Sequence, residues 1–549
     1  MCFKKCNLFD NPCQMLNSLA NPGDRTDPAP GTPQWGWPVF LYVIYLTYWI
    51  VAHVFLNEKF SKGGFDDWYQ NTCVIAAQSS LLHFRWPLLG GFPPFDVGWG
   101  THWPLYMVLK SAVFSILPYS ETAMYSFSMI VASLCSGWIV YAIAKRTANP
   151  WLALLGGAAV LSDRMMRFHL VAARSEPLAA ALLLMVVYHS RKLSGGAATR
   201  CSHLGYLLPY FLLPTLHPFG ITVTGGLALV HLLYYNRLFP QRGPVLRWLP
   251  LGCYLGGLGA LCLWFALQPA AWEQMRLNLS VQGQIYAEAT RFTYFLNLMP
   301  SYEALLGYPF WGGGLICALG VVAAFVRSVW SGRCGPMPVI HTDLVLAAAA
   351  VVALPVIGFL LRIDNYFHFT VGLGCVVYLI CSLSYSCDRR AARWLAVVML
   401  ACFAGVASLS PGYRLVKYFR CGAPDLGRER EVIVGKYQSA RRLYVPLCLY
   451  NEAMERCPER ARMFKFPVPM PESVRRSYDN YVYSDVMPGD ILIVNRCELP
   501  ANDHYLNRAV RSFSPPDPSR WDFVARHLQE TPTLRGGSSG WDLFVYRRK

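Results

Sequence analysis

The feature that most constrains this chain is the run 37–56, WPVFLYVIYLTYWIVAHVFL, which contains no Asp, Glu, Lys or Arg. A helix needs roughly 17–25 largely apolar residues to cross a bilayer, so this run is long enough to span one. Further apolar runs lie at 122–144, 148–162, 170–189, 204–217, 219–235, 246–268, 304–326, 342–361, 367–386 and 393–410. We therefore predict an all-α polytopic membrane protein with about eleven transmembrane helices.

The composition agrees with a membrane protein. Hydrophobic residues make up 54% of the 549-residue chain and charged residues only 15%, whereas an ordinary soluble protein has about 25% charged residues. A polar, Pro-rich segment, 1–36, precedes the first span. This arrangement favours a retained anchor over a cleavable secretory signal and predicts a cytoplasmic N-terminal segment.

The run 103–118, WPLYMVLKSAVFSILP, decides the topology, because an additional span here would invert every later helix. If it does not cross, the basic loops all face the cytoplasm, as the positive-inside rule requires. These loops are 145–146, 191–200, 237–247, 327–333 and 389–393. We therefore predict that 103–118 is an interfacial helix within a first outer loop, 57–121.

The character of the chain changes after residue 410. Segment 411–549 has no spanning run, and short β-like pieces at 490–496 and 541–548 accompany a candidate short helix at 520–528. Eleven crossings from a cytoplasmic start end outside. We therefore predict a transmembrane domain at 37–410 followed by a small extracytoplasmic α/β domain at 411–549.

Charges of both signs gather at the predicted outer ends of the spans. Charges near hydrocarbon are costly unless they are paired or line a wet cavity, so this pattern predicts a polar site that opens outward. The acids are Asp66, Asp67, Asp96, Glu121, Asp163, Glu176, Glu273, Glu288, Glu303 and Asp364, and the arginines are Arg85, Arg164, Arg167, Arg174 and Arg362.

Several function classes find no support in the sequence. Walker A, GxGxxG and HExxH patterns are absent, which disfavours an ATP-driven pump or a soluble-type hydrolase. The net charge of +17 is spread along the chain rather than gathered in one stripe, so we expect no nucleic-acid partner. No CxxC pair or zinc spacing occurs; Cys421, Cys448, Cys457 and Cys497 lie in the predicted outer domain, where an oxidising compartment could pair them.

Four short motifs occur in a characteristic order. An acid-bearing outer loop, GGFDDWYQN (63–71), is followed by HWPLY (102–106), AARSEPL (172–178) and HPFG (217–220). This order resembles the GT-C membrane glycosyltransferases, and most closely the branch of protein O-mannosyltransferases and aminoarabinose transferases. The resemblance covers about residues 37–235 and continues to the C-terminus only as architecture.

The resemblance implies a GT-C fold and an enzyme that transfers a sugar from a polyprenyl-phosphate donor to an acceptor on the outer face. In that family an acid just after the first span is the catalytic base, a position that Asp66 or Asp67 matches. The usual family pattern is Asp-Glu, so the Asp-Asp pair leaves open which carboxylate is the base. Either residue could instead cap the helix that begins at DWYQN, because Asp is a favoured N-cap.

The chemistry explains these residue types independently. Inverting displacement at an anomeric carbon needs a carboxylate to take the acceptor proton, while a cation stabilises the departing phosphate. Arg matches phosphate oxygens best, and Arg174 is the leading candidate, followed by Arg164, Arg167 and Arg362. Glu176 would orient Arg174 or bind sugar hydroxyls, although Arg174 could also pair only with Glu176 or lipid headgroups. His102 and His217 are weaker candidates, since a His in such a position is more often structural.

We expect no required cofactor and no metal, although Asp66, Asp67 and Asp163 could together bind a divalent cation. The expected partners are the polyprenyl-phosphate sugar donor, membrane lipid, and a lipid, glycan or protein acceptor. The predicted location is the plasma or inner membrane, with the site facing the periplasm or exterior. A multi-pass transporter, or a flippase or polymerase of lipid-linked glycans, remains the alternative.

Overall fold

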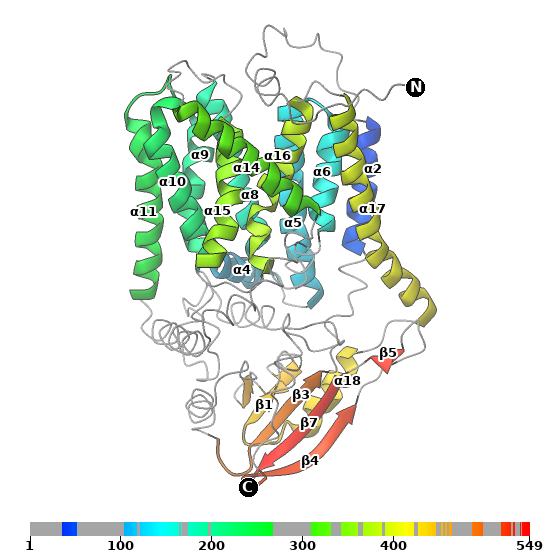
Figure 1. Cartoon of the computed structure of the whole chain (residues 1–549). Coiled ribbons are helices and arrows are strands. Elements are labelled where there is room, and N and C mark those ends of the chain that lie inside the picture. Colours follow the sequence, from blue (N-terminus) through cyan, green and yellow to red (C-terminus); the bar gives the residue numbers. More distant parts are fainter. Residues whose placement is uncertain are drawn as a thin grey trace.

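The computed structural model forms a helical bundle with a small sheet beyond one end (Figure 1). It describes residues 36–51, 104–117, 121–163, 166, 174–195, 199–266, 309–330, 342–360, 366–386, 390–421, 426–445, 449, 452–453, 456–457, 460–463, 486–497, 518–528, 531–532, 538–539 and 541–549. The predictions for Asp66, Asp67, His102, Arg164, Arg167 and Arg362 lie outside these residues, as does most of the segment 57–121.

A helix is present at each of the predicted apolar runs. They are α2 (Gly36–Ile50), α5 (Glu121–Thr147), α6 (Pro150–Ser162), α8 (Glu176–Ser194), α9 (Arg200–Leu216), α10 (Pro218–Leu238), α11 (Val245–Ala266), α14 (Pro309–Trp330), α15 (Thr342–Leu360), α16 (Leu373–Ser386) and α17 (Arg390–Cys421). A 3₁₀ helix, η5 (Tyr366–Gly372), precedes α16. The predicted, mostly helical architecture is confirmed.

Within the described part of the chain, 4 helices are both long and apolar enough to cross a membrane. They span Ser126–Thr147, Pro218–Leu238, Val245–Trp264 and Trp311–Trp330. Large apolar side chains lie exposed on the bundle, among them Leu134 at 70% and Ile316 at 73%. Such surfaces suit a lipid environment rather than water, so the helices are those of a multi-pass membrane protein.

Helix α4 (Pro104–Ile116) falls in the ambiguous run 103–118. It has 13 residues, which gives a length of about 20 Å, and the hydrocarbon core of a bilayer is roughly 30 Å thick. The helix packs on α9 and lies across the lower end of the bundle (Figure 1). The helix predicted in this run is confirmed, and its interfacial position stays a prediction.

Helices α5 and α6 pack closely because small residues line their contact. A side chain on Gly157 would place its Cβ 2.3 Å from a methyl of Val140. The close approach lets the Ser136 hydroxyl donate a hydrogen bond to the Gly157 carbonyl at 3.0 Å. Small residues at helix contacts and hydroxyl groups that bond across them are typical of membrane bundles.

The C-terminal sheet has 5 strands in the order β2-β1-β3-β7-β4. These are β1 (Leu443–Val445), β2 (Ala461–Met463), β3 (Ile491–Cys497), β4 (Trp521–Leu528) and β7 (Trp541–Arg548); β5 (Thr531–Pro532) and β6 (Ser538–Ser539) form a separate pair. Strand β1 runs parallel to β2 and β3, and β7 runs antiparallel to β3 and β4. Helix α18 (Leu426–Tyr437) packs on one face, and Cys457 is a free, buried thiol in that core.

The strands predicted at 490–496 and 541–548 are confirmed, but the short helix predicted at 520–528 is wrong, because this segment is strand β4. Trp521, Phe523 and Val524 favour a pleated surface, and pairing with β7 fixes the segment as a strand. A local pattern does not reveal that partner. Helix α17 also continues to Cys421, past the boundary predicted at residue 410.

Candidate functional site

At the lower end of the bundle, the ends of several helices bring predicted site residues together. Helix α6 ends at Ser162, α8 begins at Glu176, and α9 and α10 meet at His217. Arg174 lies just before α8 and is buried, as are Asp163, Glu176 and His217. We call Arg174, Glu176 and His217 the site cluster.

Glu176 is the centre of the site cluster. Its Oε1 lies 3.6 Å from Nη1 of Arg174 and 3.3 Å from Nε2 of His217. All three side chains are less than 5% exposed. A buried carboxylate is tolerated only when cations or hydrogen-bond donors compensate it, and Arg174 and His217 provide both here.

The position of His217 fixes its hydrogen-bonding role. The ring caps α10, because Nδ1 accepts a hydrogen bond from the Phe219 N–H at 3.1 Å. A ring nitrogen that accepts a hydrogen bond carries no proton, so in this arrangement Nε2 carries the hydrogen and presents it to Glu176. His217 therefore holds α10 and the carboxylate in one geometry.

The motif HPFG has a physical explanation in this structure. Pro218 occupies the first turn of α10, where its missing N–H costs nothing. A Cβ on Gly220 would lie 2.1 Å from the Leu213 carbonyl oxygen of α9. Gly220 thus lets α10 begin directly against the last turn of α9, which places His217 between the two helices.

The start of α8 adds to the electrostatics of the cluster. Glu176 is the first residue of the helix and Pro177 follows in its first turn. A helix N-terminus carries a partial positive charge, which favours the Glu176 carboxylate and any other anion at this position. Arg174 precedes that terminus, so its guanidinium and the partial positive charge of the helix both lie at the N-terminus of α8.

Aromatic side chains form an apolar surface beside the site cluster. The His217 ring stacks on Phe219 with centroids 5.9 Å apart, and Phe219 contacts Phe369 at 5.8 Å. Phe369 of η5 in turn contacts Trp311 of α14 at 6.0 Å. Because this surface is apolar, charges in the cluster interact more strongly than they would in water.

Asp163 lies at the end of α6, and its Oδ1 accepts a hydrogen bond from the Met166 N–H at 3.2 Å. The preceding residue, Ser162, bonds to the Tyr45 hydroxyl of α2. Helix α2 continues from Tyr45 to Ile50, so the chain leaves α2 at this same end of the bundle. The segment that follows α2 carries Asp66 and Asp67.

The structure therefore brings Arg174, Glu176 and His217 into contact and places Asp163 at the same end. Among the residues that it describes, no group of three or more His, Cys, Asp or Glu could hold a metal ion. Asp66 and Asp67, which with Asp163 formed the cation alternative, lie outside those residues.

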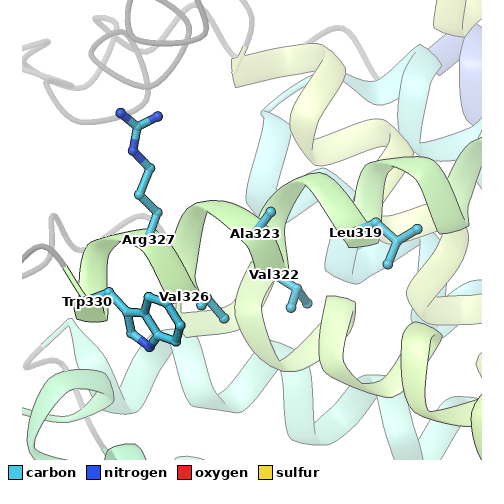
Figure 2. A pocket seen from close by; sticks show the side chains of 6 residues that line it. All are labelled: Leu319, Val322, Ala323, Val326, Arg327 and Trp330. Atoms are coloured by element: carbon cyan, nitrogen blue, oxygen red, sulfur yellow. The ribbon is translucent and has the colours of Figure 1, made fainter.

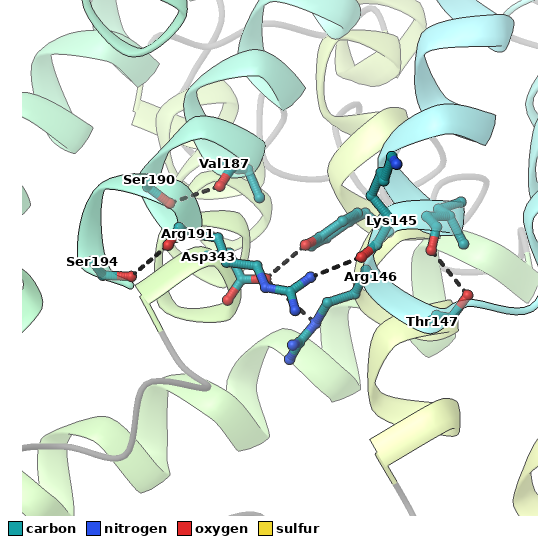
Figure 3. Close-up of polar contacts among 10 residues, drawn as sticks. Lys145, Arg146, Thr147, Val187, Ser190, Arg191, Ser194 and Asp343 are labelled. Atoms are coloured by element: carbon teal, nitrogen blue, oxygen red, sulfur yellow. Dashed lines mark hydrogen bonds and ion pairs between the residues drawn. The ribbon is translucent and has the colours of Figure 1, made fainter. Parts of the chain in front are cut away.

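A second buried polar cluster, which the sequence interpretation missed, lies at the opposite end of the bundle. Asp343 of α15 is fully buried; its Oδ2 lies 3.4 Å from Nε of Arg146 and accepts a hydrogen bond from the Tyr378 hydroxyl at 2.6 Å. Arg191 of α8 donates to the Lys145 carbonyl at 3.2 Å (Figure 3). The sequence signal that could have identified Asp343 is its position as an acid in the first turn of a predicted span.

An apolar groove of about 670 Å³ runs along α14. Its lining is Leu319, Val322, Ala323, Val326, Arg327 and Trp330. The Arg327 guanidinium extends away from the apolar side chains (Figure 2). The groove contains no carboxylate and no second cation, so it lacks the groups that glycosyl transfer would need.

No family model and no curated protein sequence matches this chain. The candidate site thus rests on its own geometry: a buried arginine, a carboxylate and a histidine at a helix N-terminus, backed by an apolar surface. This arrangement can bind an anion and orient hydroxyl groups.

Proposed function

We propose that this protein is a membrane glycosyltransferase of the GT-C type, which transfers a sugar from a polyprenyl-phosphate donor to an acceptor outside the cytoplasm. About eleven transmembrane helices carry the site at their outer ends. The single observation that carries the proposal is the buried contact of Arg174, Glu176 and His217 at the start of α8. The motifs AARSEPL and HPFG, from which the resemblance was drawn, contribute all three residues.

The proposed reaction divides the work between two sets of residues. The carboxylate of Asp66 or Asp67 takes the proton of the acceptor hydroxyl as its oxygen attacks the anomeric carbon. The bond from that carbon to the phosphate oxygen breaks, and polyprenyl phosphate leaves with the electron pair. Arg174 and the N-terminus of α8 stabilise the departing phosphate, so a general acid is not needed.

Glu176 and His217 have a positioning role in this proposal. Glu176 holds the Arg174 side chain, and His217 holds Glu176 by donating from Nε2. A guanidinium whose position is already fixed loses little entropy when it binds phosphate. The sugar hydroxyls would approach the same carboxylate.

Sugar transfer tests the proposal directly. Membranes with wild type, Asp66→Asn, Asp67→Asn or Arg174→Ala would be given a panel of radiolabelled polyprenyl-phosphate sugars, with expression measured alongside. We expect wild-type transfer from one donor and a loss of about 100-fold or more in one of the Asp variants, since general base catalysis contributes about 10²–10⁴-fold. No transfer from any donor by well-folded wild type would contradict the proposal and favour the transporter.

A further inference from the structure

Two helices in contact, α5 and α8, carry the same Tyr-x-x-x-Lys pattern near their C-termini, at the end of the bundle opposite the site cluster. The sequences are YAIAK (141–145) and YHSRK (188–192). Residues four apart lie one turn apart on the same side of a helix, so each lysine can reach over its tyrosine. The Nζ atoms of the two lysines lie 5.7 Å from the Tyr141 ring centroid and 4.9 Å from that of Tyr188, respectively.

The two tyrosines join these pairs into one cluster. Their ring centroids are 5.6 Å apart, and the Tyr188 hydroxyl donates a hydrogen bond to the Tyr141 hydroxyl at 3.4 Å. The Trp138 ring packs on both, with its centroid 5.6 Å from that of Tyr141 and 5.2 Å from that of Tyr188. We call these residues the lysine cluster; its members are Trp138, Tyr141, Lys145, Tyr188 and Lys192.

The positive charge of the lysine cluster has no neighbouring carboxylate to neutralise it. Segments 142–149 and 189–200 contain no Asp or Glu. Among the residues that the structure describes, neither lysine of the cluster forms an ion pair, and both are exposed. The nearby Asp343 pairs with Arg146 at 3.4 Å, and the Lys145 side chain points away from that pair (Figure 3). The two ammonium groups are therefore available to an anion from outside the protein.

An exposed apolar stripe of α5 leads to the lysine cluster. Ile130 is 58% exposed, Leu134 is 70% exposed and Tyr141 is 42% exposed; the exposed Gly137 continues the same helical spacing between the last two. The rise from Ile130 to Tyr141 is about 16 Å, close to half of the roughly 30 Å hydrocarbon core of a bilayer. The stripe thus has the length of one leaflet's acyl chains, and the lysines follow where the headgroups begin.

We propose that the lysine cluster binds the headgroup of an anionic phospholipid from the leaflet at this end of the bundle, with an acyl chain along the apolar stripe. The Lys145 and Lys192 ammonium groups bind the anionic headgroup. The Tyr141 hydroxyl accepts from Tyr188, so its own hydrogen is free to donate to the lipid phosphate. The stripe distinguishes a lipid from a soluble anion, which would need the lysines alone. The inference does not depend on the proposed function, since a transporter could bind the same lipid.

Photolabelling of the full-length protein in phosphatidylcholine vesicles tests this inference. The probe is a trace of phosphatidylglycerol with a diazirine on one acyl chain, and the same diazirine on phosphatidylcholine is the neutral probe. We expect phosphatidylglycerol to label segment 126–145 more strongly in wild type. Lys145→Gln and Lys192→Gln should each lower that preference by about fivefold, the size of one cation at an anionic membrane surface. Raising the salt to about 0.5 M should lower it too, because salt screens exposed charges.

Three further variants separate the charge from other effects. Arg327 is an exposed cation of α14, a helix that packs on α15 and α16, so Arg327→Gln should change the preference by less than about twofold. Lys145→Arg keeps the charge and should retain most of the preference. Tyr141→Phe should lower labelling by both probes alike, by about threefold, because both lipids have a phosphate that accepts a hydrogen bond. Melting midpoints in detergent would verify that each variant folds.

Three results would overturn the inference. One is equal labelling of segment 126–145 by the two probes in wild type. Another is a loss of preference in Arg327→Gln as large as in the double variant Lys145→Gln/Lys192→Gln. The third is competition by glycerophosphoglycerol, the same headgroup without acyl chains, that is as effective as competition by phosphatidylglycerol; the site would then be one for a soluble anion. A preference lost only in the lysine variants, with their melting midpoints unchanged, supports the inference.

Discussion

Single residues at the α9–α10 junction determine the geometry of the site cluster. His217 ends α9, caps α10 and reaches Glu176, all from one position. The first turn of α10 cannot move closer to α9, because its backbone at Gly220 already lies against the Leu213 carbonyl. Small changes here should therefore be transmitted to the carboxylate.

Gly220→Ala tests this dependence. The new Cβ would meet a backbone oxygen at 2.1 Å, so α10 must shift and His217 must withdraw from Glu176. We expect a loss of stability of about 1–3 kcal/mol, the usual cost of overpacking, and reduced sugar transfer. Thermal unfolding in detergent and the transfer assay measure the two effects.

Gly226→Ala is the matched control, since it lies in the same helix with nothing within 4 Å of its Cβ. It should be neutral or stabilising by up to about 1 kcal/mol, because Ala favours helices more than Gly does. If both substitutions behaved alike, the close contact at Gly220 would not be needed.

At this scale the sequence interpretation named Arg174, Glu176 and His217 as candidates, because they lie at predicted outer span ends in motifs that resemble those of GT-C enzymes. The sequence could not indicate which atoms would meet. It also did not identify Asp343 as the partner of Arg146. That pairing joins two helices far apart in the chain and leaves no local pattern.

At the level of elements, a hydrogen bond between helices compensates a proline. Pro250 lies inside α11 and has no N–H, so the Leu246 carbonyl one turn earlier lacks its usual helical donor. His231 of α10 donates to that carbonyl from Nε2 at 3.0 Å, while its Nδ1 accepts from the Tyr206 hydroxyl of α9 at 2.8 Å. Three helices are thereby joined through one buried ring.

A double-mutant cycle tests this compensation. His231→Phe should destabilise the protein by about 1–3 kcal/mol, the cost of leaving buried polar groups without partners. Pro250→Ala supplies a backbone N–H to the same carbonyl, so His231→Phe should cost less in that background. Unfolding in a denaturing detergent titration gives the free energies; equal costs in both backgrounds would show that the bond to Leu246 is unimportant.

Most elements could be predicted, because long apolar runs specify helices through composition alone. Segment 520–528 could not, since its partner strand β7 decides its conformation. The helix predicted in the run 103–118 is present as α4. Its interfacial position, which was inferred from the positive-inside rule, stays a prediction.

Across the whole molecule, the two ends of the bundle have different chemistry. Glu176 and Arg191 lie at opposite ends of α8, about 22 Å apart for a rise of 1.5 Å per residue. One end has the site cluster, and the C-terminal sheet lies beyond it. The other end has Arg146 and the buried Asp343, an ion pair that joins α5 to α15. The Arg146–Asp343 pair therefore serves as a control for the Arg174–Glu176 pair when the effect of a substitution on binding is measured.

The measurement that tests the central claim most directly is the binding of a polyprenyl phosphate to purified Arg174→Gln and Arg146→Gln variants. Each variant leaves a buried carboxylate without its arginine, which typically costs about 3–5 kcal/mol, so their losses of stability should be similar. With binding normalised to folded protein, we predict that Arg174→Gln weakens it by about 10–100-fold, the size of charge-assisted hydrogen bonds, while Arg146→Gln binds like wild type. Equal binding by both variants would contradict the assignment of Arg174 to the donor phosphate.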